Sequence, residues 1–202
     1  MKLKNKICLV TGGSRGIGRS IVEDLIKNGG IVVFTYLNDL ESAKRIEDSF
    51  NTSEISALQM DVSNRDSVRN IFNEICNIYD KIDVLVNNAG INKPEDFDKI
   101  NDEDWDEVFN VNLKGPFIVT QEFFPLLKKS KSASIINISS VSGQYGGPRT
   151  AHYAASKAGL ISLSQVIARF GAKYNIRSNS LSAGLILSDM AEEGLQSPAV
   201  KE

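Results

Sequence analysis

The sequence predicts an α/β protein built on a doubly wound parallel sheet with helices on both faces. Short apolar runs alternate with segments of helical periodicity along most of the 202 residues, and most of these runs are continuously apolar. Continuous apolar strands are typical of parallel sheets that are buried on both sides. The sequence also contains no internal repeat and no Pro/Gly-rich linker, so we expect a single domain over residues 1–202.

Six apolar runs are expected to form the strands, at 7–10, 31–34, 55–60, 84–86, 135–138 and 176–181. Between them, apolar residues recur three or four positions apart, as a helix with one buried face requires. The clearest examples are Ile17, Ile21 and Leu25; Val68, Ile71, Phe72 and Ile75; and Leu160, Leu163 and Ile167. The repeated order of strand, helix and strand is that of a doubly wound sheet.

Composition and charge argue against several classes of protein. The 23 Lys and Arg residues against 25 Asp and Glu give a net charge of −2, so we expect no nucleic-acid partner. No apolar run approaches the roughly 20 residues that span a bilayer, and the run at 7–10 is too short for a signal peptide. We therefore expect a cytoplasmic protein without a membrane partner. Cys8 and Cys76 are expected to be buried thiols, and the single histidine predicts no metal site.

A glycine-rich turn follows the first expected strand and leads directly into a helix. It reads Thr-Gly-Gly-Ser-Arg-Gly-Ile-Gly over residues 11–18. Its glycines allow the backbone to turn tightly and approach a pyrophosphate, and the helix N-terminus offers free N–H groups. The alternative is a glycine turn without a ligand, but its place between a strand and a helix favours a dinucleotide site of the Rossmann type.

The spacing of this turn resembles that of the short-chain dehydrogenase/reductase family, and further motifs follow in the family's order. They are Asp61-Val62, Asn87-Asn88-Ala89-Gly90, Asn112, Ser140 and Tyr153-Ala-Ala-Ser-Lys157. The resemblance implies an oxidoreductase that binds a nicotinamide dinucleotide. The residues that it assigns to the cofactor are Gly12, Gly13, Ser14, Arg15, Gly16, Ile17, Gly18, Leu37, Asp61, Val62, Asn88, Ala89, Gly90, Tyr153, Lys157, Ile186 and Ser188.

Tyr153 and Lys157 lie four positions apart and so share one face of a helix. A lysine ammonium near a phenol favours the phenolate, which would bring the tyrosine pKa toward a useful range. By itself such a pair is typical of an ordinary amphipathic helix. The resemblance implies that Tyr153 protonates a carbonyl oxygen as hydride arrives and that Lys157 also holds the nicotinamide ribose. It further implies that Ser140 orients this oxygen and that Asn112 positions a water in a proton relay.

The neighbours of these residues offer competing candidates. Ser139 and Ser142 flank Ser140, but the thirteen positions between Ser140 and Tyr153 match the register of the family. His152 precedes Tyr153 and points about 100° away around the helix. We therefore expect His152 to be solvated or at the rim of a substrate site rather than catalytic.

The form of the cofactor is predicted from the second expected strand. NAD-preferring members of the family place an acidic residue near its end, and none stands near Tyr36. Arg15 stands where NADP-preferring relatives use a cation against the 2′-phosphate, so we expect NADP (NADPH). Many of those relatives carry a second basic residue where this chain has Leu37, and Asp39 is expected to be a turn or helix-cap residue.

Within the family, residues 9–19 are most similar to bacterial 3-oxoacyl-[acyl-carrier-protein] reductases. This similarity implies reduction of 3-oxoacyl thioesters, bound to an acyl carrier protein, to 3-hydroxyacyl thioesters in fatty-acid-type biosynthesis by a homo-oligomer, a tetramer or dimer. An alcohol, sugar or steroid dehydrogenase and a non-catalytic dinucleotide-binding protein remain as alternatives. Four lysines are candidates for steering an acidic carrier protein to the site, unless they form an ordinary solvated cluster: Lys128, Lys129, Lys131 and Lys173.

The sequence departs from the family pattern near its C-terminal end. Ala183 stands where the family has a proline, and Ser188 keeps a hydroxyl where threonine is usual. The sequence ends at Glu202, inside the substrate lid that we expect to begin at about residue 189. The seventh strand of the family is thus expected to be missing, which would leave an open sheet edge and an uncovered apolar face.

Overall fold

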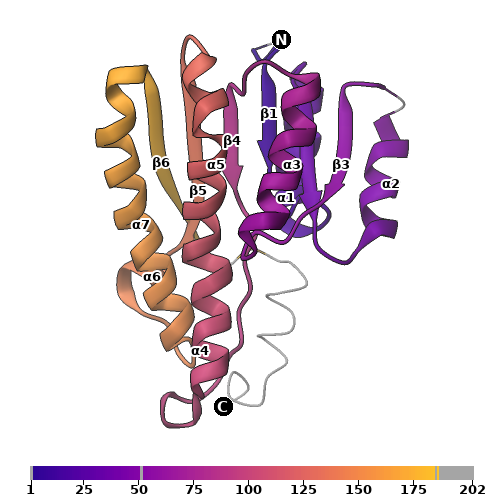
Figure 1. The fold of residues 1–202 in the computed structure, drawn as a ribbon. Coiled ribbons are helices and arrows are strands. Elements are labelled where there is room, and N and C mark those ends of the chain that lie inside the picture. The colour runs from indigo at the N-terminus through magenta and orange to yellow at the C-terminus, as the bar shows by residue number, and fades with distance from the viewer. Residues whose placement is uncertain (1, 51, 185, 187–202) are drawn as a thin grey trace.

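A computed structural model describes residues 2–50, 52–184 and 186 (Figure 1). Within these residues, six parallel strands form one sheet in the order β3-β2-β1-β4-β5-β6. The strands are β1 (Ile7–Val10), β2 (Ile31–Tyr36), β3 (Ile55–Gln59), β4 (Val84–Asn87), β5 (Ala133–Ser140) and β6 (Ile176–Ala183). The strand order reverses between β1 and β4, which is where ligands bind in doubly wound sheets. The predicted fold class and all six expected strands are confirmed.

Helices connect the strands in sequence. The α-helices are α1 (Gly16–Lys27), α2 (Leu40–Phe50), α3 (Arg65–Ile78), α4 (Asp102–Phe109), α5 (Gly115–Lys129), α6 (Ser142–Tyr145) and α7 (Ala151–Gly171). Two short 3₁₀ helices, η1 (Phe97–Lys99) and η3 (Ala172–Tyr174), and a π-helical turn, η2 (Asn110–Lys114), complete the set. The three apolar stripes that the sequence revealed lie in α1, α3 and α7. No described helix combines the length and the apolar character that crossing a bilayer would require.

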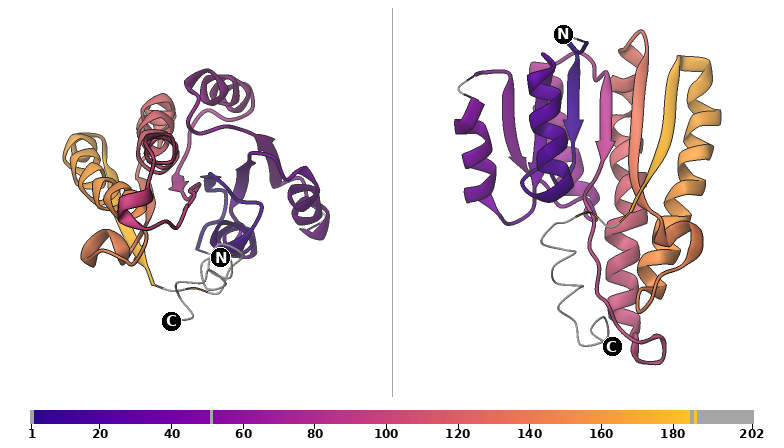
Figure 2. Two further views of the ribbon diagram at one scale, coloured as in Figure 1. Left: turned by 90° about the horizontal axis from the view of Figure 1, so that it is seen from below. Right: turned by 180° about the vertical axis from the view of Figure 1, so that it is seen from behind.

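The helices cover the sheet in two layers (Figure 2). Helices α3, α5 and α7 pack on one face, where Ile71, Phe123 and Ile167 join a core with Leu9 and Ile135 of the sheet. Helices α1 and α2 pack on the other face, over a second core that contains Val10 and Phe34.

The sheet is covered unevenly within the described residues. On the face that carries α1 and α2, no described helix lies over β6, which forms the outer edge of the sheet (Figure 2). Leu181 of this strand is 54% exposed. The expected absence of a seventh strand after β6 stays a prediction. The expected lid from residue 189 onward lies outside the described residues.

The two cysteines differ in their surroundings. Cys8 is buried in β1, and burial raises the pKa of its thiol to about 12. Cys76 is exposed, so the expectation that both thiols are buried is wrong for this one. The reason is helical register, because Ile75 takes the inward position in α3 and turns the next residue toward solvent.

A buried carboxylate, Asp83, joins the amino ends of the strands. It accepts hydrogen bonds from the Ile7 amide at 3.1 Å and from the Ser130 hydroxyl at 2.7 Å. Lys6 and Lys81 pair with it, each at 3.1 Å. Burial alone would raise the pKa of Asp83, but these partners outweigh burial and hold the pKa below its ordinary value. Asp83 therefore stays charged in the folded protein and stabilises the junction of β1, β4 and β5.

Replacing Asp83 with Asn should lower the free energy of unfolding by roughly 1.5–3 kcal/mol at pH 7, because charge-assisted hydrogen bonds are lost. Since the folded pKa lies below the ordinary value of 3.8, the contribution is present above about pH 4 and is lost as the pH falls below it. Urea unfolding of both proteins at pH 7 and pH 3 measures this difference. The exposed Asp48 of α2 provides the control, and equal effects of Asp83→Asn and Asp48→Asn would contradict the assignment.

Candidate active site

The glycine turn between β1 and α1 brings three backbone segments into close contact. Gly12 has a φ angle of +65°, which other residues rarely adopt. A Cβ atom at Gly18, in the first turn of α1, would lie 2.1 Å from the Gly12 carbonyl oxygen and 2.4 Å from Nδ2 of Asn88. Only glycine at position 18 allows α1 to begin this close to the ends of β1 and β4.

The hydroxyl of Thr11 joins the ends of β1 and β4. It accepts hydrogen bonds from the main-chain N–H groups of Asn88 and Ala89, at 3.0 Å each. The side chain of Asn88 donates in return to the carbonyl oxygens of Thr11 at 3.0 Å and Gly12 at 2.8 Å. These bonds hold Asn88 and Ala89 beside the glycine turn.

The N-terminus of α1 opens onto this turn without a side-chain cap. Its N-cap residue is Arg15, whose side chain makes no capping hydrogen bond. Because the first N–H groups of a helix have no partner within the helix, such an end can bind an anion. The exposed guanidinium of Arg15 adds positive charge at the same place. The turn is therefore suited to a phosphate or pyrophosphate group.

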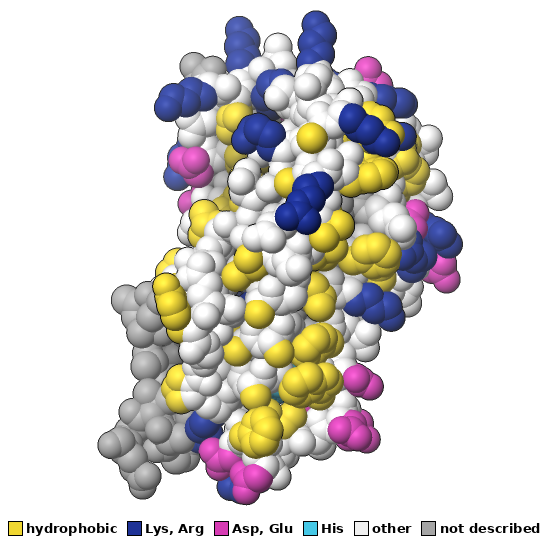
Figure 3. Space-filling view, turned by 90° about the vertical axis from the view of Figure 1, so that its left-hand side faces the viewer, with side chains coloured by type: hydrophobic (Ala, Val, Ile, Leu, Met, Phe, Trp, Pro, Cys, Tyr) yellow, Lys and Arg dark blue, Asp and Glu magenta, His cyan; other side chains and the backbone are white. Residues whose placement is uncertain are grey.

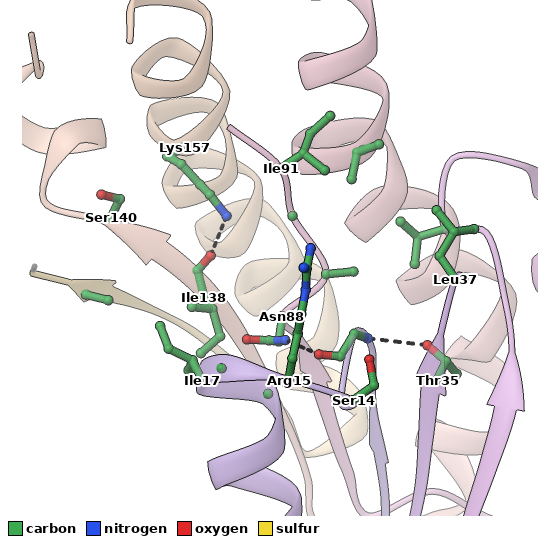
Figure 4. A pocket seen from close by; sticks show the side chains of 18 of the residues that line it. Ser14, Arg15, Ile17, Thr35, Leu37, Asn88, Ile91, Ile138, Ser140 and Lys157 are labelled. Carbon is green, nitrogen blue, oxygen red and sulfur yellow. Dashed lines mark hydrogen bonds between the residues drawn. The ribbon is translucent and has the colours of Figure 1, made fainter. Parts of the chain in front are cut away.

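A cavity of about 690 Å³ lies at the carboxyl ends of the strands. Figure 4 shows Thr35 and Leu37 at one side of it and Ser140 and Lys157 at the other, with Arg15 and Asn88 between them. The structure brings most of the predicted site residues together in its walls: Gly12, Ser14, Arg15, Gly16, Ile17, Gly18, Leu37, Asp61, Val62, Asn88, Ala89, Gly90, Ser140, Tyr153, Lys157 and Ile186.

Two of the predicted residues lie elsewhere, and a third is not among the described residues. The amide of Gly13 donates to the Thr35 carbonyl oxygen at 2.8 Å, and a Cβ atom on Gly13 would clash with the Phe34 side chain. Gly13 therefore packs the turn against β2 and does not line the cavity. Asn112 is fully buried behind the wall. Ser188 lies outside the described residues.

Ser140, Tyr153 and Lys157 come together at one end of the cavity. Ser140 ends β5, and the other two residues lie one turn apart in α7, which packs against β5 and β6. The Nζ atom of Lys157 lies 5.6 Å from the centre of the Tyr153 ring and donates a hydrogen bond to the Ile138 carbonyl oxygen at 2.8 Å (Figure 4). A hydroxyl, a phenol and an amine thus share one wall.

Burial controls the acidity of this group. It raises the pKa of Tyr153, although hydrogen bonding to the Ser140 side chain lowers that pKa in part. It also lowers the pKa of Lys157 to about 8. The expectation that an ammonium group brings the phenol pKa down is wrong for this structure, because Lys157 is itself buried and directs its Nζ atom to Ile138. The phenol is therefore protonated at neutral pH.

Asn112 connects the loop after β4 to α7 through its side chain. Oδ1 accepts from the Ile91 amide at 2.9 Å, while Nδ2 donates to the Ile91 carbonyl oxygen at 2.9 Å and to the Ser156 hydroxyl at 3.2 Å. A Cβ atom on Gly90 would lie 3.2 Å from Oδ1 and 3.3 Å from Nζ of Lys157. Both amide N–H groups are used, which leaves one acceptor position on Oδ1 beside Lys157.

Sequence reasoning assigned no side-chain role to two threonines beside the cavity, Thr11 and Thr35. Thr11 organises the junction described above, and the Thr35 hydroxyl accepts from the Gly12 amide at 3.4 Å. Each of these threonines stands at the carboxyl end of an apolar run, and this position could have indicated a role for Thr11 and for Thr35. Asp39 also lines the cavity. Its expected role as a cap is confirmed, because Oδ1 accepts from the Ser42 amide at 2.9 Å.

The expectation that His152 is solvated or at a substrate rim is wrong. Its side chain is completely buried, and its ring lies 6.5 Å from that of Trp105. The helical period correctly predicted that His152 points away from Tyr153. However, α4 packs against that side of α7 and buries the ring.

The four lysines proposed to steer a carrier protein do not stand at the mouth of this cavity. Three of them precede β5, and Lys173 precedes β6. Because β5 runs eight residues toward the cavity at about 3.3 Å per residue, roughly 25 Å separates its two ends. Lys128 and Lys173 instead lie over the ring of Tyr174, at 5.3 and 5.1 Å from its centre. Electrostatic steering to the mouth by these lysines is therefore ruled out within one chain.

A doubly wound sheet, a glycine turn at its switch point and a serine, tyrosine and lysine in one wall define a class of dinucleotide-dependent oxidoreductase. Comparison with protein families agrees, because the model of the short chain dehydrogenase family matches residues 6–198. The chain belongs to this family.

Several bacterial proteins named 3-oxoacyl-[acyl-carrier-protein] reductase FabG are similar to this chain. The protein from Thermotoga maritima is 37% identical over 195 residues, covering 96% of this chain and 79% of the relative. The protein from Staphylococcus epidermidis is 38% identical over 188 residues, covering 92% and 77%. The protein from Aquifex aeolicus is 38% identical over 192 residues, covering 94% and 77%.

Replacing Gly18 with Ala should weaken binding of the nicotinamide dinucleotide by about tenfold or more, a cost of about 1.4 kcal/mol. The added methyl group overlaps the Gly12 carbonyl and the Asn88 side chain, so the helix end must move away from the turn. Fluorescence titration with NADPH and NADH measures the loss. Asp24→Ala is the control, because Asp24 lies on the exposed face of the same helix, outside the residues that line the cavity. Unchanged affinity in Gly18→Ala would show that the turn is not the binding site.

Proposed function

We propose that this protein is an NADPH-dependent reductase that converts 3-oxoacyl thioesters of an acyl carrier protein to 3-hydroxyacyl thioesters in fatty-acid-type biosynthesis. The observation that carries the proposal is the position of Ser140, Tyr153 and Lys157 in one wall of a cavity that the glycine turn also lines. The names of the relatives support the substrate class. The proposal treats residues 1–202 as one catalytic domain.

The residues around the cavity fit a nicotinamide dinucleotide. The uncapped end of α1 and the Arg15 side chain offer positive charge for the pyrophosphate. Asp61 and Val62 would hold the adenine end beyond β3, and Asn88, Ala89 and Gly90 would flank the middle of the molecule. The Lys157 amine would hold the nicotinamide ribose, with Ile186 at the nicotinamide. When bound, the cofactor supplies the hydride.

The side chains of the protein would position and protonate the substrate carbonyl. The Ser140 hydroxyl donates a hydrogen bond to the carbonyl oxygen and so orients it. The Tyr153 phenol transfers its proton to that oxygen, and its raised pKa keeps the proton available at neutral pH. Lys157, with a pKa of about 8, is suited to return a proton to the phenol. Asn112 would hold a water through the free acceptor position of Oδ1, as a link from Lys157 to solvent.

Preference for NADPH over NADH would depend on a balance of two charges. Arg15 offers a cation for the 2′-phosphate, and Leu37 is neutral. Hydrogen bonds from Ser42, and after them the charges of Arg45 and Arg15, lower the pKa of Asp39, so its carboxylate stays negative beside the cavity. Asp39 would therefore oppose the phosphate that Arg15 attracts.

We further propose that the protein works as a homo-oligomer. Helices α5 and α7 carry exposed apolar side chains, among them Phe117, Val166 and Phe170 at 42%, 56% and 55% exposure. Figure 3, which faces the side of the molecule that α7 covers, shows hydrophobic side chains gathered there. Exposed apolar surface of this kind is typical of contact between protein chains.

Replacing Tyr153 with Phe should lower reductase turnover by about 10²–10⁴-fold, because only the proton donor is removed. Oxidation of NADPH, followed by absorbance with acetoacetyl carrier protein and a small acetoacetyl thioester, measures turnover. Tyr145→Phe is the matched control, since Tyr145 is 87% exposed. A parent protein that reduces sugars or steroids but not thioesters would refute the substrate assignment. Full activity in Tyr153→Phe would refute the role of the phenol.

Replacing Arg15 with Ala should weaken NADPH binding at least about tenfold more than NADH binding, because a charge-assisted contact to the 2′-phosphate is lost. Leu37→Asp should act in the same direction. Asp39→Asn should strengthen NADPH binding without altering NADH binding, since it keeps the cap oxygen and removes the charge. Fluorescence titration with both cofactors tests all three variants. Equal losses for NADPH and NADH in Arg15→Ala would mean that Arg15 supports the turn alone.

A further inference from the structure

His152 is a buried polar side chain that the mechanism above does not use. It is the one histidine of the sequence, its exposure is 0%, and it directly precedes Tyr153. Its ring lies nearly parallel to that of Trp105 in α4, with 6.5 Å between centres and 24° between planes. Trp105 stacks in turn on Phe109 at 4.9 Å. A column of aromatic rings thus links α4 to the first turn of α7.

Neither ring nitrogen of His152 makes a hydrogen bond of ordinary geometry among the described residues, although the main-chain carbonyl of Lys93 is close enough to act on the ring. Most buried polar groups are satisfied, so two unsatisfied nitrogens on one ring call for an explanation. The charged groups that act on the ring are Asp104 of α4 and Lys93 of the preceding loop. Lys93 pairs with Asp104 and also with Glu107 of α4. On α7 the adjacent titratable group is Tyr153.

These surroundings favour a neutral ring. A protonated imidazole has two N–H donors, and burying its charge is costly unless both donors find well-placed acceptors. Burial accordingly lowers the pKa of His152, while the Asp104 carboxylate and the Lys93 carbonyl oppose this effect. At neutral pH the side chain therefore acts as an uncharged spacer between the two helices. In mildly acidic solution, protonation favours arrangements in which the ring leaves the interface.

The helix pair that His152 separates also carries the candidate proton relay. The π-helical turn η2 continues directly from α4 and holds Asn112, which donates to Ser156 of α7 at 3.2 Å. The two contacts between these segments therefore reach α7 at His152 and at Ser156, one before and one after Tyr153 in the sequence. A change at His152 therefore acts on the segment that presents the phenol.

We propose that His152 is a positioning residue, whose neutral ring against Trp105 holds Tyr153 in place relative to Ser140, and whose protonation loosens this turn and lowers turnover. The inference rests on the proposed role of Tyr153 as the proton donor.

The first test follows the ring itself by NMR. Because the chain has one histidine, its imidazole signals can be assigned without ambiguity. We expect them to titrate below the ordinary pKa of 6.5, and the ring signals of Tyr153, identified by their loss in Tyr153→Phe, to shift with the same midpoint. A His152 pKa at or above 6.5 would overturn the proposal. So would Tyr153 ring signals whose chemical shifts do not change as His152 titrates. This test needs no catalytic activity, so its outcome is separate from that of the proposed function.

The second test is stability against pH. With a folded pKa below 6.5, the unfolded chain binds the proton first as the pH falls, so stability decreases from pH 7 to pH 5.5. The thermal midpoint of the parent should fall over this range, and that of His152→Phe should change less. Phe keeps a flat ring against Trp105 and removes the titration. An equal fall in both proteins would overturn the proposal.

The third test is the pH profile of turnover. The parent kcat should fall below about pH 6.5 with the midpoint that NMR gives, while His152→Phe should keep its kcat down to pH 5.5 and stay within about threefold of the parent at pH 7.5. KM for NADPH should be the same in both. If His152→Phe does not fold, His152→Gln is measured in its place. If kcat of the variant that lacks the histidine falls below pH 6.5 as kcat of the parent does, the proposal is overturned.

Discussion

The site depends on the junction that the Thr11 hydroxyl makes between β1 and β4. These two strands meet where the strand order of the sheet reverses, so among the described residues no helix that connects two strands crosses the gap between their carboxyl ends. One hydroxyl accepts from two consecutive amides there, and Asn88 returns two hydrogen bonds to the glycine turn. These hydrogen bonds hold the Gly12 carbonyl and the Asn88 side chain where Gly18 can pack closely against them. The end of α1, the cavity and the cofactor that we propose for it all follow from this contact.

Two buried ionisable groups at opposite ends of the sheet show how stability and chemistry are separated. Asp83 is surrounded by two lysines and two hydrogen-bond donors, so it keeps its charge and stabilises the amino ends of the strands. Lys157, at the carboxyl ends, has only the Ile138 carbonyl as a hydrogen-bond partner for its amine among the described residues, and its pKa falls to about 8. A paired charge resists titration, whereas an unpaired one becomes available for proton transfer near neutral pH.

Features that depend on short stretches of sequence could be predicted directly. Apolar runs identified all six strands, and the turn at residues 11–18 lies between β1 and α1 as expected. The spacing of Tyr153 and Lys157 placed both side chains on one face of α7, and both line the cavity. Asp39 is the cap that its position indicated. Each of these depends on backbone geometry within a few residues, which the local sequence largely determines.

Features that depend on which elements pack together could not be predicted in this way. The helical period gives the angle of His152 around α7, but only the position of α4 decides that this side is buried. Likewise, four lysines that are compatible with a docking cluster lie at the far end of the sheet from the cavity. The pKa of Tyr153 is raised, which is opposite to the expectation, because burial outweighs any effect of the Lys157 charge. Burial also lowers the pKa of Lys157 to about 8. The sequence alone therefore determined the elements and the motifs that carry the chemistry. Burial and its electrostatic consequences were decided by tertiary structure, because solvent exclusion depends on every segment that packs around a group.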